Sequence, residues 1–396
     1  MRSTARLAGE LDGLDCTAWS GLDHPSVYSS HEWLLARSRF MLGTAGFVLI
    51  EREGTGLVAG VPCFRLDEDS HPGYEPLSLL ASDFLASGGL EDAAEVALLK
   101  DAMGSSAAQC RPSMVATCPG RAGGISYSPA LTPDERAEAA ELAVMTVEAA
   151  ARDESAPTVC WLYLAEGRDG ALERTLRGRG YTEITIAAEC YLPITWSGLD
   201  EYLSGFRSKH RNKIQREMAA LVEAGVEVRE AGCDALGPDL AQLEVQWRRK
   251  YGRSSSADEV MAEYELLRSC VGDRMRIFVA QQGERTLGFT TFLEDEGRWY
   301  AGAGGFDYTV TGLFLYYNLL FYHPIKAAIG SGIFCINYTY ASYAAKRSRG
   351  CQLRGVMAYM KFPAHVVGRV NPCLRAVDAL QRQRFDRISE YRVERK

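Results

Sequence analysis

The chain has 396 residues, of which 47% are hydrophobic and 24% are charged. This length and composition fit two packed domains of ordinary size and exclude a disordered tract or one enlarged core. Every apolar stretch is interrupted by charge or glycine, and the first thirty residues lack the apolar core of a signal peptide, so we expect a cytoplasmic protein without membrane insertion. The eleven cysteines are odd in number, scattered, and form no C-x-x-C pair or zinc spacing, which predicts reduced thiols and no metal site.

The net charge of −7 is unevenly distributed along the chain. Residues 1–198 carry 28 acidic and 15 basic side chains, whereas residues 199–396 carry 23 acidic and 29 basic ones. A basic half joined to an acidic half favours a localised site for a polyanion, such as tRNA or a phosphate-bearing cofactor. Solvated helix faces are the alternative interpretation of the same charges.

Short runs of β-branched and aromatic residues predict strands in the first half at residues 46–51, 57–66, 114–118, 158–164 and 184–194. Helical patterns occupy the intervening residues 30–39, 91–103, 134–152 and 170–179. The third helix has a well-marked start, because Thr132 and Pro133 supply a cap residue and an N1 proline before an alanine-rich run.

The second half is predicted to open with a long helix from Ser197 to about Ala224, stopped by Gly225. A short strand (226–229) and two helices (238–251 and 257–270) lead to a meander of three alternating strands at 274–281, 285–294 and 298–304. The remaining elements are predicted at 312–329 (helix), 333–337 (strand), 342–348 (helix), 352–361 (strand) and 369–389 (helix). Since the two halves share an element order, we expect an α/β fold with mixed sheets and two domains, 1–198 and 199–396.

A meander followed by a helix that crosses to a further strand resembles the GNAT acyltransferase fold. The resemblance is strengthened by four strings, at Pro25–Leu35 (PSVYSSHEWLL), Leu79–Phe84 (LLASDF), Phe206–Arg216 (FRSKHRNKIQR) and Tyr343–Gly350 (YAAKRSRG). These strings are similar to the duplicated-GNAT acyltransferases, which include the Fem-type aminoacyltransferases of peptidoglycan bridges and relatives in natural-product pathways. The resemblance implies two GNAT-like acyltransferase domains in tandem, with the active site in residues 199–396.

One departure from ordinary GNAT enzymes concerns the donor substrate. A CoA-using GNAT domain places a Q/R-x-x-G-x-G/A loop at the start of the helix after its meander, where backbone N–H groups cradle the pyrophosphate. Here that stretch keeps only Gly312, and Asp307 would repel phosphate. The glycine-rich run 301–305 lies in or at the end of a strand, where glycine more often marks close packing or a bulge. Fem-type enzymes also lack the loop, which implies aminoacyl-tRNA as co-substrate and no bound cofactor, with acyl-CoA as the alternative donor.

Basic residues gather at three places in the second half. Like charges one helical turn apart destabilise a helix, so the first cluster predicts an anionic partner such as tRNA phosphate. Its members are Arg207, Lys209, Arg211, Lys213 and Arg216. Arg248 and Arg249 form a second cluster beside Trp247 and Tyr251, and residues 361–396 carry nine basic and four acidic side chains. A solvated face is the alternative for each.

The segment after the strand at 333–337 lies where the fold places the transferred acyl group. Lys346 matches the lysine of a K-x-x-x-G-like family pattern, which implies a cation that stabilises the charge developing on the carbonyl oxygen during aminolysis. Tyr343 and Arg347 are predicted to bind substrate, Arg347 through a phosphate. A surface position on a short helix is the alternative for Lys346 and Arg347.

The attacking amine must be neutral, which requires a carboxylate or a water relay. Asp83, in the family-like S-D-F string, is the candidate that holds or deprotonates this amine, and a turn aspartate is the alternative. Asp307 is a second candidate. No His has a spacing to Ser or Cys that identifies a nucleophile, so direct attack is expected.

Three functions follow from these observations. The first is transfer of an aminoacyl group from aminoacyl-tRNA to a small-molecule or peptidoglycan-precursor amine. The second is acyl-CoA-dependent N-acyl transfer by the same fold. The third is a non-catalytic RNA-binding or recognition protein that kept the fold.

Overall fold

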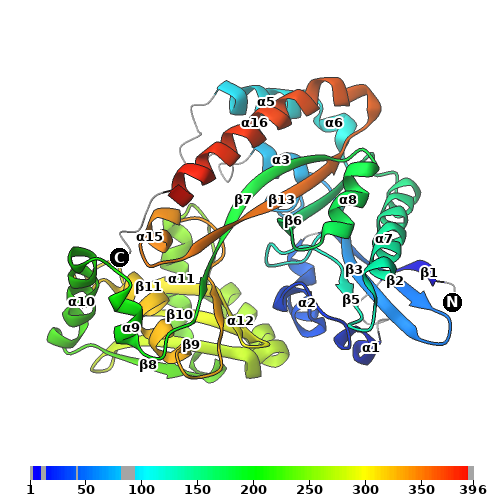
Figure 1. Ribbon diagram of the computed structural model, residues 1–396. Coiled ribbons are helices and arrows are strands. Elements are labelled where there is room, and N and C mark those ends of the chain that lie inside the picture. The colour runs from blue at the N-terminus through cyan, green and yellow to red at the C-terminus, as the bar shows by residue number, and fades with distance from the viewer. Residues whose placement is uncertain (1–2, 10–14, 42, 82–93, 391–396) are drawn as a thin grey trace. The chain divides into compact units, whose positions relative to one another are not determined.

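The computed structural model describes residues 3–9, 15–41, 43–81 and 94–390, and Figure 1 shows its elements. The chain forms two compact units. Unit 1 comprises residues 1–189 and 354–387, and unit 2 comprises residues 190–353 and 388–396. Within the described residues, no helix combines the length and apolar character needed to cross a bilayer.

The first part of the chain contains the following elements: β1 (Ser3–Ala8), α1 (Cys16–Ser20), η2 (Val27–Ser29), α2 (His31–Arg37), η3 (Ser38–Met41), β2 (Thr44–Arg52), β3 (Gly56–Leu66), α3 (Pro76–Ala81), α5 (Ala94–Gly104), α6 (Ala107–Cys110), β4 (Ser113–Ala116), β5 (Ser126–Tyr127), α7 (Pro133–Asp153), β6 (Thr158–Ala165), α8 (Gly170–Gly178) and β7 (Thr182–Pro193).

The second part continues with α9 (Leu199–Ser204), α10 (Ser208–Glu223), β8 (Glu227–Ala231), η4 (Cys233–Ala235), α11 (Pro238–Lys250), α12 (Ala257–Val271), η5 (Gly272–Arg274), β9 (Met275–Gln282), β10 (Arg285–Asp295), β11 (Arg298–Phe306), α13 (Leu315–Tyr317), the π-helical turn η6 (Asn318–Tyr322), α14 (His323–Ala328), β12 (Cys335–Asn337), α15 (Tyr343–Arg347), β13 (Gln352–Lys361) and α16 (Ala364–Glu390).

The sheet of unit 1 has the strand order β1-β2-β3-β4-β6-β13-β7, with β5 paired to β3. Its core lies between the sheet and α7, whose alanine-rich face packs against buried residues of β2, β3 and β6. The predicted start of α7 is confirmed, because the Thr132 hydroxyl caps the Glu135 N–H in a capping box and Pro133 occupies the first turn.

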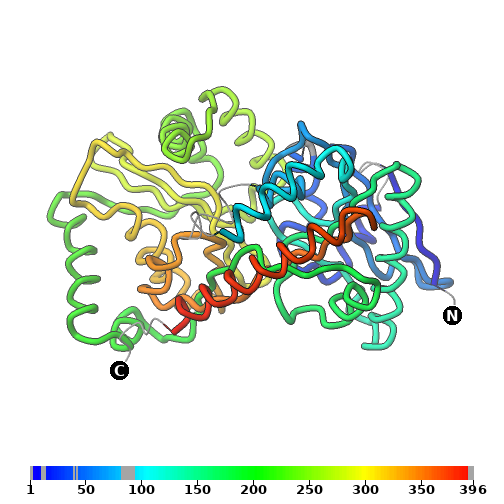
Figure 2. The backbone as a smooth tube through the Cα atoms, turned by 90° about the horizontal axis from the view of Figure 1, so that it is seen from above, coloured from blue at the N-terminus to red at the C-terminus, as the bar shows by residue number. Residues whose placement is uncertain are grey.

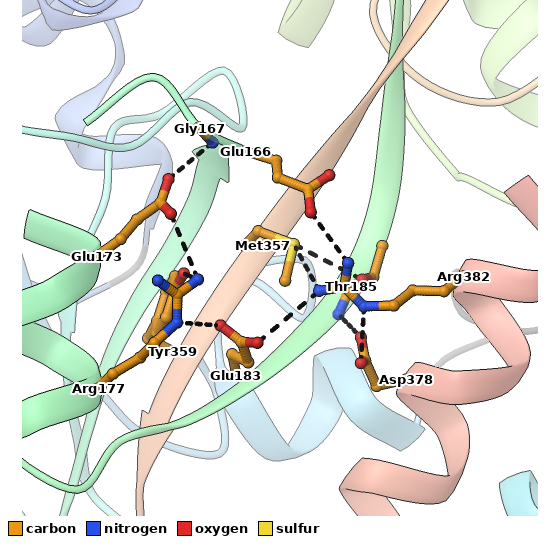
Figure 3. A network of polar contacts seen from close by, with 10 residues as sticks. All are labelled: Glu166, Gly167, Glu173, Arg177, Glu183, Thr185, Met357, Tyr359, Asp378 and Arg382. Atoms are coloured by element: carbon orange, nitrogen blue, oxygen red, sulfur yellow. Dashed lines mark hydrogen bonds and ion pairs between the residues drawn. The ribbon is translucent and has the colours of Figure 1, made fainter. Parts of the chain in front are cut away.

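The last strand and helix of the chain pack in unit 1. Figure 3 shows the polar contacts that tie them there, with Arg177 of α8 contacting both Glu183 of β7 and the Tyr359 hydroxyl of β13. Arg382 of α16 donates to Asp378 and Glu166, and Asp378 accepts a hydrogen bond from a β7 backbone N–H. Figure 2 shows α16 running along unit 1. These contacts place residues 354–387 in unit 1, whereas the division at residue 198 assigned them to the second domain.

Unit 2 is a sheet in the order β7(190–193)-β12-β11-β10-β9-β8, with helices on both faces. The helix α11 approaches one face so closely that a Cβ at Gly305 would lie 2.5 Å from the Leu243 backbone. The opposite face meets η6, where the Thr290 hydroxyl donates to the Leu319 carbonyl over 2.6 Å. The glycines of β11 therefore allow close packing, as we expected for a glycine-rich run within a strand.

The two units repeat one order of elements. In unit 1 the strands β2, β3 and β4 are followed by α7, the parallel partner β6, and α8. In unit 2 the strands β9, β10 and β11 are followed by α13 to α14, the parallel partner β12, and α15. The predicted mixed α/β fold with two GNAT-like halves is confirmed by this repetition.

Two predicted elements differ in detail. The long helix from Ser197 is divided into α9 and α10, because the Gly205 N–H closes α9 on the Tyr202 carbonyl and Arg207 adopts an extended conformation. The helix predicted from Gly312 begins only at Leu315, because Phe314 before it has a left-handed conformation.

Candidate active site

The sheet of unit 2 opens where β11 and β12 part. These strands pair in parallel only between Arg298–Tyr300 and Cys335–Asn337. Beyond this point β11 continues to Phe306, whereas β12 ends and the chain enters the loop 338–342. The opening is therefore bordered by the end of β11, by the loop 338–342 and by the first turn of α13.

The loop 338–342 has a costly backbone conformation. Three of its residues are not glycine and yet have positive φ, namely Thr339 (56°), Ala341 (62°) and Ser342 (50°). Each such residue costs on the order of 1 kcal/mol or more and persists only where the surroundings hold it. Residues in such conformations cluster at functional sites, so the loop is the most distinctive feature beside the opening.

Lys346 is the residue that holds this loop. Its ammonium is buried, with 4% of the residue exposed, and donates to the carbonyls of Tyr338 (2.6 Å) and Tyr340 (2.5 Å). Burial lowers the pKa of Lys346. The family resemblance implied a cation that faces the acyl carbonyl, and in the structure the ammonium contacts two backbone carbonyls of the loop that joins β12 to α15. These contacts hold the loop, and a direct role of the ammonium in the reaction stays a prediction.

A buried ion pair links the middle of α10 to Arg349, which follows α15, and contacts η6. Arg349 donates to Glu217 over 2.5 Å, and both side chains are at most 3% exposed. The Tyr322 hydroxyl donates to the same Glu217 oxygen, and Arg349 stacks on the Tyr317 ring with its guanidinium carbon 3.8 Å from the ring centre. This network fixes α10 against η6 and contains the only acidic side chain between residues 207 and 217. Sequence reasoning did not identify it, since its members lie far apart in the chain.

The predicted basic cluster becomes an exposed face of α10. Arg207, Lys209, Lys213 and Arg216 are exposed, and Arg211 is half-buried with hydrogen bonds to the Phe206 carbonyl and the Ser208 hydroxyl. Figures 1 and 2 both show α10 at the margin of unit 2. His210 is directed inward, where its ring contacts the Ser348 carbonyl over 2.6 Å, and burial lowers its pKa. The outward face of α10 is thus strongly cationic.

The other predicted binding residues have different surroundings. Arg248 is largely buried between Glu244 (2.6 Å) and Glu263 (2.9 Å), so its charge joins α11 to α12. Arg249 is exposed on α11. Arg347 donates to the backbone carbonyls of Cys351 and Ser389.

Aromatic side chains surround the opening. Tyr316 packs edge-on against Phe306 and Tyr317, and Phe306 contacts Tyr308. Tyr343 is half-buried and packs against the same hydrophobic cluster. Burial raises the pKa of Tyr316 well above its ordinary value, so its hydroxyl remains a proton donor at neutral pH.

Two candidates for the amine-binding carboxylate have different outcomes. Asp83 lies outside the described residues. Asp307 accepts hydrogen bonds from the Thr309 N–H and hydroxyl and from Arg285, so it closes a turn at the end of β11. None of the eleven cysteines forms a disulfide, and six of them are buried, including Cys351. In the part of the chain that the structure describes, no group of three or more His, Cys, Asp or Glu side chains has a geometry for metal binding.

Solved structures are similar to this chain in fold. FemX is 9% identical, with a TM-score of 0.58 over 94% of this chain and 100% of its own. A conserved protein of unknown function from Bacteroides thetaiotaomicron is 14% identical, with a TM-score of 0.55 over 90% of this chain and 100% of its own. A tandem GNAT protein from the clavulanic acid biosynthesis pathway is 12% identical, with a TM-score of 0.46 over 90% and 98% of the two chains.

No curated protein sequence matches this chain significantly. One family model matches residues 129–367, which is more than half of the chain, and that family is described as peptidoglycan biosynthesis/recognition. The match covers the end of unit 1 and all of the opening in unit 2, with its strained loop and the cationic face of α10. The chain belongs to the FemAB-like family.

Proposed function

We propose that this protein forms an amide bond by moving an aminoacyl group from aminoacyl-tRNA to an amine, carried either by a small molecule or by a peptidoglycan precursor. The family and the GNAT-like fold support an acyltransferase related to peptidoglycan chemistry. The donor, the acceptor and the route are our proposal.

The cationic face of α10 is the observation that carries the proposal. Its exposed basic side chains follow one another within three turns. The single carboxylate among them, Glu217, is buried against Arg349, and its second oxygen lies 3.9 Å from the Lys213 ammonium. Such a face costs stability through self-repulsion unless an anion neutralises it. An RNA backbone supplies closely spaced phosphates of that kind.

The surroundings of β11 support the choice of donor. The glycines near its end pack closely against other parts of unit 2, since Gly302 lies against Thr291 and Gly305 against α11. The turn that follows contains Asp307, held by Arg285, and the helix begins with bulky residues. A pyrophosphate cradle needs free N–H groups and no carboxylate, so this segment favours aminoacyl-tRNA over acyl-CoA.

The reaction is written as a direct aminolysis. The neutral amine attacks the ester carbonyl carbon, the C–N bond forms, and the C–O bond to the terminal ribose breaks. The proton lost by the amine passes through a carboxylate or water to the departing ribose oxygen, which leaves as the tRNA hydroxyl. A donor must stabilise the charge on the carbonyl oxygen meanwhile, and we assign this role to Tyr316 of α13, which packs against Phe306 at the end of β11 and has the Ser342 side chain of the loop 338–342 as a hydrogen-bond partner.

The test uses tRNA binding against salt concentration. Wild-type affinity should fall steeply as salt rises, and Arg207→Ala, Lys209→Ala or Lys213→Ala should each flatten the slope of log K against log salt by up to about one unit. Lys326→Ala, an exposed cation on α14 of the same unit, is the matched control and should leave the slope unchanged.

Transfer is then measured with charged bulk tRNA and candidate amines, with and without ribonuclease. Activity that needs intact tRNA supports the proposal. Activity that survives ribonuclease and requires acyl-CoA would overturn the donor assignment, and so would the absence of salt-sensitive tRNA binding at low ionic strength.

A further inference from the structure

Unit 1 contains a cavity at the position equivalent to the opening of unit 2. The strands β4 and β6 pair in parallel only between Ser113–Ala116 and Thr158–Trp161, after which β6 continues to Ala165 without β4 while its other edge stays paired with β13. The cavity has a volume of about 530 Å³ and is lined by the end of β6, the segment 123–127 and the first turns of α7 and α8. This volume lies in the range of small-molecule sites.

The floor of the cavity is apolar and fixed. Ile125, Leu131, Leu164 and Leu172 line it and are all buried. The segment 123–127 is held against β6, because the Gly123 N–H donates to the Tyr163 carbonyl over 3.0 Å and a Cβ at Gly123 would lie 2.0 Å from the Leu162 oxygen. The floor is therefore built from buried side chains and from a segment that is hydrogen-bonded to β6.

The carboxylates that line the cavity already have donors from the protein. Asp169 accepts from the Tyr127 hydroxyl (2.8 Å) and caps α8 through the Leu172 N–H (3.0 Å). Glu173 accepts from the Gly167 N–H and from Arg177, as Figure 3 shows. Asp23 lies 3.5 Å from Arg136. Burial, followed by the neighbouring Asp169, raises the pKa of Tyr127, so this hydroxyl stays protonated and keeps donating to Asp169.

Guanidinium groups line the same cavity from two helices and the turn between β6 and α8. Arg136 comes from α7 and stacks on Tyr127, Arg168 precedes α8, and Arg174 belongs to α8. The Arg174 Nη1 lies only 3.2 Å from where a Cβ of Gly170 would be, so its side chain folds back over the first residue of the helix. Among the described residues, no carboxylate forms an ion pair with Arg174. Since planar guanidinium groups suit carboxylate and phosphate, this side of the cavity favours an anion.

From these features we propose that the unit 1 cavity binds a small molecule with a carboxylate or phosphate head and an apolar body. The head contacts Arg174 and Arg136, and the body lies on the leucine and isoleucine floor. This site is separate from the aminoacyl-transfer site proposed in unit 2, so either proposal can fail without the other.

The experiment titrates the full-length protein by calorimetry at low ionic strength with phenyl phosphate, with benzoate and with the neutral benzyl alcohol. We expect one site per chain for at least one of the two anions and no binding of benzyl alcohol. The stronger anion assigns the head group as phosphate or carboxylate. Arg174→Gln and Arg136→Gln should each weaken binding about tenfold, the usual effect of losing one charge-assisted contact.

Two further variants separate the cavity from general electrostatics and folding. Arg152→Gln removes an exposed charge at the other end of α7 and should leave the affinity unchanged. Ala171→Phe fills the cavity from a half-buried position on α8 and should abolish binding while the melting temperature is retained. The proposal is overturned if neither anion binds at concentrations up to about 10 mM, or if binding is insensitive to both Arg174→Gln and Ala171→Phe.

Discussion

Lys346 illustrates how burial changes the role of a single residue. The family resemblance implies a cation at the acyl carbonyl, with a surface position as the alternative, and in the fold the ammonium is buried against the carbonyls of Tyr338 and Tyr340. A buried carbonyl that loses its donor costs about 1–3 kcal/mol. The strained loop beside the opening therefore depends on this one side chain.

Lys346→Met keeps the length of the side chain and removes both hydrogen bonds. We expect the free energy of unfolding to fall by about 2–4 kcal/mol, because two carbonyls become unpartnered. Turnover should fall together with stability, as the loop 338–342 relaxes. Chemical denaturation and transfer assays on the same preparation check this. If turnover falls about 10² to 10³-fold at unchanged stability, the ammonium acts on the reaction itself, as the sequence implied.

His323 predicts a pH dependence of stability. Burial lowers its pKa to about 4 from an ordinary value of 6.5, with a smaller contribution from Lys326. Between these two values His323 is protonated in the unfolded chain but neutral in the folded chain. The free energy of unfolding should therefore fall as the pH drops below 6.5 and level off below about 4. Between pH 7 and pH 5 the free energy of unfolding should fall by at most about 2 kcal/mol, and solvent screening makes the loss smaller.

Urea denaturation at pH 7 and pH 5 tests the assignment with His323→Gln. The variant should lose much of the acid sensitivity of the wild-type protein. His365→Gln, on the exposed side of α16, should retain it in full. Equal acid sensitivity in all three proteins would show that another group controls the transition.

At the scale of elements, glycine decides how closely helices pack on β11. Gly305→Ala would bring a Cβ to 2.5 Å from the backbone of α11, which has no flexible atoms to move aside. We expect a loss of about 2 kcal/mol or more from this overpacking. Gly368→Ala is the matched control, since nothing lies within 4 Å of its Cβ and it sits inside α16, where alanine is favoured by about 0.5–1 kcal/mol. Thermal unfolding should therefore move in opposite directions for the two variants.

The elements also show what the sequence could predict. The meander, α7 with its cap and the glycine-rich strand follow from periodicity and local signals, and these predictions are confirmed. The split between α9 and α10 and the late start of α13 depend on the left-handed or extended backbone of one residue, which no pattern reveals. The Glu217–Arg349 pair was missed because 132 positions separate its members and nothing local marks either as buried.

At the scale of the molecule, the chain completes unit 1 with a strand from its far end. In the sheet of unit 1, β13 lies between β6 and β7. The sequence predicted β13 as an element, but strand order depends on long-range pairing, so its membership of unit 1 could not be read from the chain.

A fragment of residues 1–198 should therefore fail to fold as a stable domain. Without β13, both β6 and β7 present unpaired edges, and buried residues such as Met357 and Tyr359 are missing from the core. We expect poor solubility and no cooperative thermal transition, measured by circular dichroism. A fragment that melts cooperatively with native-like stability would contradict the strand order.

The position of β13 also sets the order in which the protein can mature on the ribosome. Residues 190–353 are synthesised before the strand that completes unit 1, so the sheet of unit 1 lacks a central strand throughout their synthesis. Premature termination shortly before residue 354 would consequently leave most of unit 2 in place but remove a central strand from unit 1, the unit that was translated first.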